Sequence, residues 1–265
     1  MPFLVADFVV LIPTYNEAQN IKKTLQKVSA QQTRASFEIV VVDGGSVDKT
    51  VTIAQKYAKV LISPKKGKAH QLNYAAAQTT SKFIIFLDAD TLLPWNYIER
   101  VKKAFEHDKD LWACSGPIFY IGRAINPYFI FVVLQACIDF PQFFLFQFIW
   151  FLLQRLPEAH FKLFQPSFFY NFSMVIYYTL RQLFGSPEFS GSNIAIRRKI
   201  FEKIGGFRQP PRLGVDRLFC TVLRYYIRKE KRGKMKLIHS LVVETDARNL
   251  EFVRSLKRLK TYREF

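Results

Sequence analysis

The stretch Phe83-Ile84-Ile85-Phe86-Leu87-Asp88-Ala89-Asp90 joins five apolar residues to two carboxylates that lie one residue apart. The apolar run predicts a buried strand, and the polar turn at residues 91–94 marks its end. Two acids at the end of a strand can face a shared cation, and Mg²⁺ commonly binds one or two carboxylates together with substrate phosphates. The alternative is that Asp90 caps the next helix and Asp88 is a turn residue. The surrounding sequence decides between these interpretations.

Strand and helix signals alternate upstream of this stretch. Nearly continuous Val and Ile runs are typical of strands buried on both faces, so the pattern predicts an α/β fold with a mostly parallel sheet and helices on both faces. The predicted strands are residues 8–12, 37–42 and 60–62, and the predicted helices are residues 18–30, 49–57 and 68–78. Ligands of such sheets bind beyond the carboxyl ends of the strands. The polar segments 13–17, 43–46 and 88–90 occupy such ends and are expected to form one site.

Composition predicts a folded core and a strongly basic surface. The chain has 265 residues, of which 49% are hydrophobic and 23% charged, and its net charge is +18. Residues 197–265 carry 20 Lys and Arg but only 7 Asp and Glu, a balance that attracts phosphates, nucleic acid or anionic lipid. No nucleic-acid recognition module accompanies these charges, so we expect no nucleic-acid partner. The 3 cysteines are widely scattered, which favours reduced thiols over a disulfide or zinc framework.

The middle of the chain is unusually aromatic. Residues 129–184 contain 18 of its Phe, Tyr and Trp side chains. Residues 128–153 carry one charge, Asp139, and are long enough to cross a bilayer, but Asp139 and Pro141 interrupt them near the centre. Three interpretations remain open: a kinked transmembrane helix, a re-entrant or interfacial helical pair, and a soluble core or dimer interface. No signal peptide is recognised at the N-terminus.

The ordered motifs resemble those of a known family, the inverting nucleotide-sugar glycosyltransferases of family 2, which have the GT-A fold. The similarity covers roughly residues 8–120 and 188–245, and each motif is weak alone, whereas several in the same order are specific. The motifs are Ile12-Pro13-Thr14-Tyr15-Asn16-Glu17, Val42-Asp43-Gly44-Gly45-Ser46-Val47-Asp48-Lys49-Thr50, Gly67-Lys68-Ala69, Leu87-Asp88-Ala89-Asp90-Thr91, Ser190-Gly191-Ser192-Asn193, and Arg197-Arg198 followed by Gly205-Gly206-Phe207. The aromatic middle does not match a common core of the family.

Residues near the second and third predicted strands suit a nucleotide. Asp43 can accept a hydrogen bond from an imino N–H of uracil or guanine, although a capping or turn role is the alternative. Gly44 and Gly45 permit close backbone approach, or simply an ordinary turn. Lys68 lies at a predicted helix start, where a cation and free N–H groups suit a phosphate or ribose, although a solvated lysine is the alternative.

The resemblance assigns further donor roles. It implies that Pro13, Tyr15 and Glu17 line the nucleotide site, with Tyr15 and Glu17 flanking the base and ribose. It also implies that Asp88 contacts the ribose or a metal, and that Asp90 coordinates the divalent metal, Mg²⁺ or Mn²⁺, that bridges the diphosphate.

The catalytic base and the acceptor site are expected in the last part of the chain. The family usually places an acidic pair beyond the Gly-Gly-Phe motif, and here Asp216 matches one member while Val215 replaces the other. Asp216 keeps the single carboxylate that is required to take a proton from an acceptor hydroxyl, although a helix-cap role is the alternative. The acceptor is expected near four consecutive residues, Ser190, Gly191, Ser192 and Asn193.

These observations predict three regions: a nucleotide-sugar-binding half at residues 1–125, an aromatic-rich, helical insertion at residues 126–186, and an acceptor and catalytic half at residues 187–265. The predicted function is metal-dependent transfer of one sugar from a nucleoside-diphosphate sugar to a membrane-proximal or lipid-linked acceptor. Such an enzyme is expected at the cytoplasmic membrane face, on an anionic lipid surface. The alternatives are a sugar-nucleotide nucleotidyltransferase and a non-catalytic membrane-associated protein that retains the fold.

Overall fold

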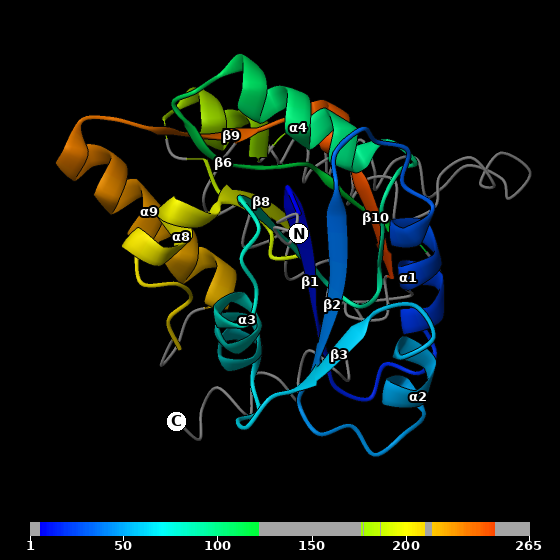
Figure 1. Ribbon diagram of the computed structural model, residues 1–265. Coiled ribbons are helices and arrows are strands. Elements are labelled where there is room, and N and C mark those ends of the chain that lie inside the picture. Colours follow the sequence, from blue (N-terminus) through cyan, green and yellow to red (C-terminus); the bar gives the residue numbers. More distant parts are fainter. Residues whose placement is uncertain (1–5, 122–175, 177, 186, 210–213, 247–265) are drawn as a thin grey trace, which may run out of the picture. The chain divides into compact units, whose positions relative to one another are not determined.

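The computed structural model describes residues 6–121, 176, 178–185, 187–209 and 214–246 (Figure 1). Contacts between Cα atoms gather residues 1–119 and 175–245 into one compact unit, to which the central sheet, the core and the candidate site residues belong. The predicted aromatic insertion, residues 126–186, falls almost wholly outside the described residues. Within the described ranges, no helix combines the length and the apolar character needed to cross a membrane.

Seven strands form the central sheet, in the order β3-β2-β1-β4-β8-β6-β9. Neighbours pair in parallel except around β8, which is antiparallel to both β4 and β6. The strands are β1 (Phe8–Thr14), β2 (Phe37–Asp43), β3 (Lys59–Ile62), β4 (Phe83–Leu87), β6 (Leu111–Ser115), β8 (Asn193–Arg197) and β9 (Lys234–Leu237). The mixed α/β fold with a mostly parallel sheet, predicted from the apolar runs, is therefore confirmed.

A second sheet has three short strands in the order β5-β10-β7. They are β5 (Thr91–Leu92), β10 (Val243–Asp246) and β7 (Ile118–Ile121). Because β5 directly follows Asp90, its pairing with β10 fixes the end of the acidic turn: Thr245 lies opposite Thr91.

Helices cover both faces of the central sheet. They are α1 (Ile21–Ser29), α2 (Thr50–Ala54), α3 (Lys68–Ala77), α4 (Tyr97–His107), α8 (Arg198–Lys203) and α9 (Val215–Glu230), with a short 3₁₀ helix, η2 (His239–Leu241). The first three confirm the helices predicted between the strands. Figure 1 shows α3, α8 and α9 together on one side of the sheet and α1 and α2 on the other.

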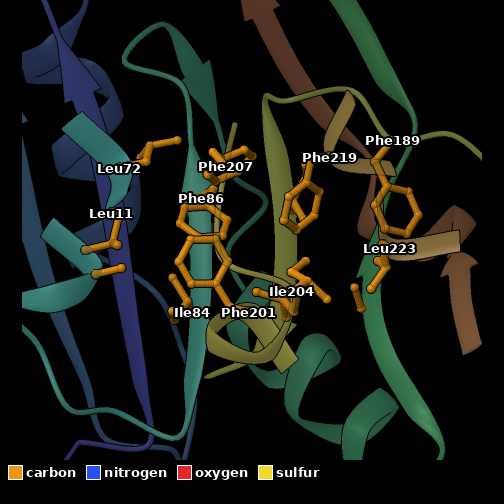
Figure 2. Close-up of a cluster of buried hydrophobic side chains, with 14 of the residues drawn as sticks. Leu11, Leu72, Ile84, Phe86, Phe189, Phe201, Ile204, Phe207, Phe219 and Leu223 are labelled. Atoms are coloured by element: carbon orange, nitrogen blue, oxygen red, sulfur yellow. The ribbon is translucent and has the colours of Figure 1, made fainter. Parts of the chain in front are cut away.

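The core beneath α3, α8 and α9 contains a group of packed aromatic rings. Figure 2 shows Phe86 of β4 facing Phe201 and Phe207, with Phe219 of α9 beside them. Ring centroids lie 4.8 Å apart for Phe86–Phe207 and 4.5 Å apart for Phe207–Phe219, distances typical of favourable ring pairs. Because Phe219 lies one turn after Asp216, this packing fixes the first turns of α9 against the sheet.

Gly116 offers a direct test of the packing between β6 and η2. A Cβ atom at this position would lie 1.8 Å from the carbonyl oxygen of Leu241, so a side chain would force two backbone segments apart. We expect Gly116→Ala to lower the free energy of unfolding by about 3 kcal/mol, measured by chemical denaturation. Gly214→Ala is the control, because no described atom lies within 4 Å of a Cβ there. Equal stability of Gly116→Ala and the wild type would contradict the packing.

Candidate active site

The ends of β1, β2 and β4 meet at one edge of the sheet. The parallel register sets Thr14 beside Asp43, and the first residues after these strands continue into the predicted polar segments. Since β8 runs antiparallel to β4, it begins where β4 ends, and Asn193 pairs with Leu87. The turn from Ser190 to Asn193 therefore lies beside Asp88. The strand pairing thus brings together two motifs that are about a hundred residues apart in the sequence.

Asp43 organises the loop that follows β2. Its buried carboxylate accepts hydrogen bonds from the hydroxyls of Thr14 (3.0 Å) and Ser46 (2.5 Å) and from the backbone N–H groups of Gly45 (2.8 Å) and Ser46 (2.7 Å). Both carboxylate oxygens thus already have protein donors. The structure gives Asp43 a loop-building role, and its predicted contact with a nucleobase stays a prediction.

The two glycines of this loop are favoured for different reasons, one by its backbone conformation and the other by a close neighbour. Gly45 has φ +89°, a left-handed conformation that favours glycine. Gly44 lies against Gln71, whose amide is 3.1 Å from where a Cβ would be. Gln71 in turn donates to the carbonyls of Thr14 and Val42, at 2.8 Å each, and so ties α3 to the ends of β1 and β2.

The segment after β1 lies against the same loop. Pro13 is the penultimate residue of β1 and is partly buried. Tyr15 is 48% exposed, and the ammonium of Lys66 lies 4.9 Å from its ring centroid. The N–H of Glu17 donates to Thr50 Oγ1 at 2.7 Å, which anchors this segment to α2. An exposed aromatic ring beside a cation is suited to stacking on a planar, anionic ligand.

Lys68 is the electrostatic centre of the edge. Its ammonium lies 2.6 Å from Asp88 Oδ1 and 3.6 Å from Asp216 Oδ1 and donates to the carbonyl of Gly191 at 3.2 Å. Burial alone would lower the pKa of Lys68, but the carboxylates of Asp216 and Asp88 raise it, and the net shift is upward. One permanent cation therefore links the end of β4 with the start of α9.

Asp216 lies in the first turn of α9, in a site that disfavours its charged form. Burial raises the pKa of its carboxyl group, and so does the nearby Asp88, whereas Lys68 and the backbone of Gly191 lower it; the net shift is upward. Within the described part of the chain, its Oδ1 is buried and accepts no hydrogen bond. A carboxylate with a raised pKa and an unused lone pair has the properties of a general base.

Gly191 makes room for that carboxylate. A Cβ at residue 191 would lie 2.0 Å from Asp216 Oδ1. We expect Gly191→Ala to displace Asp216 and to lower the turnover of any reaction that uses it by roughly 10- to 100-fold. Stability of the variant, measured by thermal unfolding, separates displacement from loss of fold. Full activity of Gly191→Ala would contradict this position of Asp216.

Asp90 lies in the turn between β4 and β5. The hydroxyl of Thr245 donates to its carboxylate at 3.3 Å, while Asp88 accepts a hydrogen bond from the hydroxyl of Ser192 at 3.1 Å. Among the described residues, no group of three or more His, Cys, Asp or Glu could hold a metal ion. The two carboxylates alone fit an ion such as Mg²⁺ or Mn²⁺ only if phosphate oxygens and waters complete its coordination.

The four residues predicted to contact an acceptor have different positions. Gly191 and Ser192 border Asp216 and Asp88, and Ser190 precedes them and is partly buried. Asn193 is completely buried; its amide donates to the carbonyl of Leu241, and its carbonyl oxygen accepts from Ser115. The side chain of Asn193 therefore supports the start of β8 through these two hydrogen bonds.

The residues at this edge fall largely within a region that matches a known protein family. A sequence model of glycosyl transferase family 2 matches residues 9–205. The chain belongs to glycosyl transferase family 2. This match spans the ends of β1, β2 and β4 together with the start of β8, but it does not include α9 or β10.

The curated relatives are matched over only part of their own lengths. The chain is 34% identical over 99 residues to the glycosyltransferase AglE of Haloferax volcanii, covering 34% of this chain and 33% of the relative. It is 30% identical over 112 residues to poly-beta-1,6-N-acetyl-D-glucosamine synthase of Staphylococcus aureus, covering 40% of this chain and 27% of the relative. The chain thus spans about a third of the length of the curated relatives it matches.

Two solved structures share the fold. The mannosyltransferase PcManGT of Pyrobaculum calidifontis, in complex with GDP-Man and Mn²⁺, has a TM-score of 0.58 at 20% identity, covering 98% of this chain and 64% of the neighbour. S. aureus TarS 1-349, in complex with UDP-GlcNAc, has a TM-score of 0.59 at 19% identity, covering 91% and 59%. The family match and these neighbours confirm the predicted GT-A fold, without testing the aromatic insertion.

Several residues of the edge have no signal in the sequence motifs. Gln71 lies inside an alanine-rich helix, and Thr245 lies in a strand that the sequence pattern does not predict. Both act through contacts between elements far apart in the chain. The only local sign for Gln71 is a polar residue on an otherwise apolar helix face, which also suits an exposed residue.

Proposed function

We propose that this chain is an inverting glycosyltransferase that transfers one sugar from a nucleoside-diphosphate sugar to a hydroxyl of a membrane-proximal or lipid-linked acceptor. The observation that carries the proposal is the position of Asp216, whose unused oxygen lies beside Lys68 and the strand-end Asp88. The family match and the nucleotide sugars bound by PcManGT and TarS support the donor class.

The chemistry follows from one displacement. The acceptor hydroxyl loses its proton to Asp216 while its oxygen forms a bond to the anomeric carbon. The bond from that carbon to the diphosphate oxygen breaks, and the leaving nucleoside diphosphate keeps the electron pair. Attack opposite the leaving group inverts the configuration, and a single carboxylate is sufficient as base.

Lys68 and the acidic turn serve the donor side of this displacement. The ammonium of Lys68, held at 2.6 Å from Asp88, supplies positive charge close to the developing charge of the leaving group. A divalent cation held by Asp90 and Asp88, with the diphosphate completing its coordination, would neutralise part of the same charge. The neighbour with Mn²⁺ bound supports this cation as part of the proposal.

Membrane association rests on sequence. The excess of Lys and Arg in residues 197–265 and the aromatic composition of residues 129–184 favour contact with an anionic lipid surface, which we propose to be the cytoplasmic face of the membrane. Salt washing of isolated membranes, compared with detergent extraction, tests this part. Complete release by high salt would exclude an inserted segment.

The donor part is tested by a panel of UDP- and GDP-sugars with Mg²⁺ or Mn²⁺, scored by released nucleoside diphosphate. We expect release from one nucleotide class, even with water as a slow acceptor. A nucleotidyltransferase would instead form or consume pyrophosphate. No release from any donor in the panel would contradict the proposed activity.

A further inference from the structure

A short segment of the chain, residues 187–191, lies along the first turns of α9. At its end Gly191 packs on Asp216, since a Cβ at residue 191 would lie 2.0 Å from Asp216 Oδ1. Two residues earlier, the backbone N–H of Phe189 donates to Cys220 Sγ at 3.2 Å. Asp216 and Cys220 are four residues apart in α9 and therefore lie on the same face of the helix.

The same spacing continues one turn further along the helix. Arg224, four residues after Cys220, donates from Nη1 to the carbonyl of Pro187 at 2.7 Å, and Pro187 is two residues before Phe189. Four residues of helix rise about 6 Å, whereas two residues of chain span at most about 7 Å. The segment therefore has little slack between one contact with α9 and the next.

Cys220 provides the middle contact. Its side chain is completely buried, as is that of Phe189, and its sulfur lies 3.9 Å from the carbonyl oxygen of Phe189. Burial raises the pKa of the Cys220 thiol to about 12, so the thiol keeps its hydrogen and can donate to this carbonyl while it accepts from the N–H. Because a buried N–H that loses its acceptor costs free energy, the thiol fixes this part of the segment to α9.

The end of the segment serves two charged groups of the candidate site. The carbonyl of Gly191 accepts a hydrogen bond from the ammonium of Lys68 at 3.2 Å. The backbone of Gly191 also lowers the pKa of Asp216 and so stabilises its charged form. Movement of Gly191 away from α9 would weaken both interactions. A side chain that sets the distance between segment and helix therefore also sets the surroundings of Asp216.

We propose that Cys220 is a positioning residue for the base: its thiol holds the segment against α9 and thereby keeps Gly191 in contact with Asp216 and Lys68. The inference rests on the proposed glycosyl transfer and adds to it a residue that lies beyond the part of the chain matched by the family model. Cys220 acts through Gly191 and is not a catalytic residue.

Cys220→Ala removes the acceptor of the Phe189 N–H. We expect this variant to lower the turnover number for sugar transfer about 10-fold, because the base is displaced from its productive position. Donor affinity, measured by calorimetry, should change less than about twofold, because the donor residues belong to other elements. Unchanged turnover in Cys220→Ala would overturn the inference.

Two further substitutions of the same residue separate the hydrogen bond from the packing. Cys220→Ser keeps a group that both accepts and donates, and should retain about half of the wild-type turnover or more. Cys220→Val keeps apolar bulk but has no acceptor, and should lose turnover as Cys220→Ala does, which also provides the test if the alanine variant does not fold. Equal turnover of the serine and valine variants would overturn the role of the hydrogen bond.

Cys114→Ala is the matched control. Cys114 is a completely buried cysteine of β6, so its substitution removes the same atoms from the core. We expect a similar decrease in the thermal unfolding temperature, with turnover within about twofold of the wild type. An equal loss of turnover in Cys114→Ala and Cys220→Ala would show that general destabilisation is responsible and would overturn the positioning role.

The double variant with Asp216→Asn tests whether Cys220 acts through the base. If it does, Cys220→Ala should change the residual transfer rate of Asp216→Asn by less than about twofold, because effects that act through one group are not additive. A further 10-fold loss in the double variant would overturn the proposed route through Asp216.

Crystal structures of the wild type and Cys220→Ala, determined under the same conditions, test the positioning without any activity. We expect Gly191 to lie further from Asp216 in the variant, and an unchanged position would overturn the inference. If the wild type releases no nucleoside diphosphate from any donor, the proposed function fails, while these two structures still decide whether Cys220 positions Gly191.

Discussion

Asp216→Asn is expected to lower the turnover number for sugar transfer by roughly 10²- to 10⁴-fold while leaving the affinity for the nucleotide donor within about twofold. Asparagine has nearly the same shape but cannot accept the proton of the acceptor hydroxyl. Transfer is measured from initial rates with saturating donor, and donor affinity from calorimetry. We expect transfer and donor affinity to respond differently because Asp216 belongs to α9, whereas the acidic turn that would bind the donor lies between β4 and β5.

The matched control is Asp110→Asn. Asp110 is an exposed aspartate before β6, and its carboxylate lies 3.6 Å from the guanidinium of Arg232, so the substitution removes the same charge outside the site. Full transfer activity in Asp216→Asn would assign the base elsewhere. An equal loss in Asp110→Asn would show that net charge, rather than the base, is responsible.

The pH dependence of transfer provides an independent readout of the same residue. Asp216 acts as a base only when it is ionised, so activity must rise with pH through its pKa. Because burial and the nearby Asp88 raise that pKa above the ordinary aspartate value, we expect the acidic limb of the turnover profile to lie at higher pH than for an exposed aspartate. The limb is expected to disappear in Asp216→Asn, and an unchanged limb in this variant would contradict the assignment.

Lys68→Met is expected to reduce transfer by roughly 100-fold and to move the acidic limb to still higher pH. Removal of the ammonium leaves the carboxylates of Asp88 and Asp216 without the cation that both contact, and losing one partner of a largely buried pair costs a few kcal/mol. The pKa of Asp216 should rise further, because Lys68 is the main group that lowers it. Initial rates across the pH range test both effects.

Two variants control this result. Lys68→Arg retains the positive charge. Its activity should exceed that of Lys68→Met, and the pH of its acidic limb should lie close to that of the wild type. Lys22→Met removes an exposed lysine of α1 and should leave both unchanged. If Lys68→Met lowered activity without moving the limb, Lys68 would act only on the donor and would not influence the base.

The sequence predicts the parallel half of the sheet well because its signals are local. Val and Ile runs identify β1 to β4 within about two residues, and the polar residues after each strand converge because parallel strands end at one edge. The antiparallel insertion of β8 has no such local sign. Its register against β4, which sets Asn193 beside Leu87, depends on pairing between segments more than a hundred residues apart.

The residues of the candidate site can be predicted from local motifs, but the contacts between them cannot. Asp88, Asp90 and Lys68 follow from motifs, but the contact between Lys68 and Asp216 does not, because it joins the start of α3 to the start of α9. Asp43 shows a second limit: its burial and its hydrogen bonds within the loop cannot be read from the motif, and its contact with a nucleobase stays a prediction. The hydrogen bonds that both carboxylate oxygens of Asp43 accept exist only once the loop has folded.

We propose that the strand-end carboxylates and Lys68 form the donor site for a nucleoside-diphosphate sugar. The most direct measurement is a crystal structure grown with Mn²⁺ and the nucleoside diphosphate released in the donor panel, with anomalous scattering used to locate the metal. We expect a manganese peak within coordination distance of the Asp90 carboxylate, next to the diphosphate, with the base ring near Tyr15. A nucleotide bound away from the ends of β1, β2 and β4, or a metal that Asp90 and Asp88 do not contact, would contradict it.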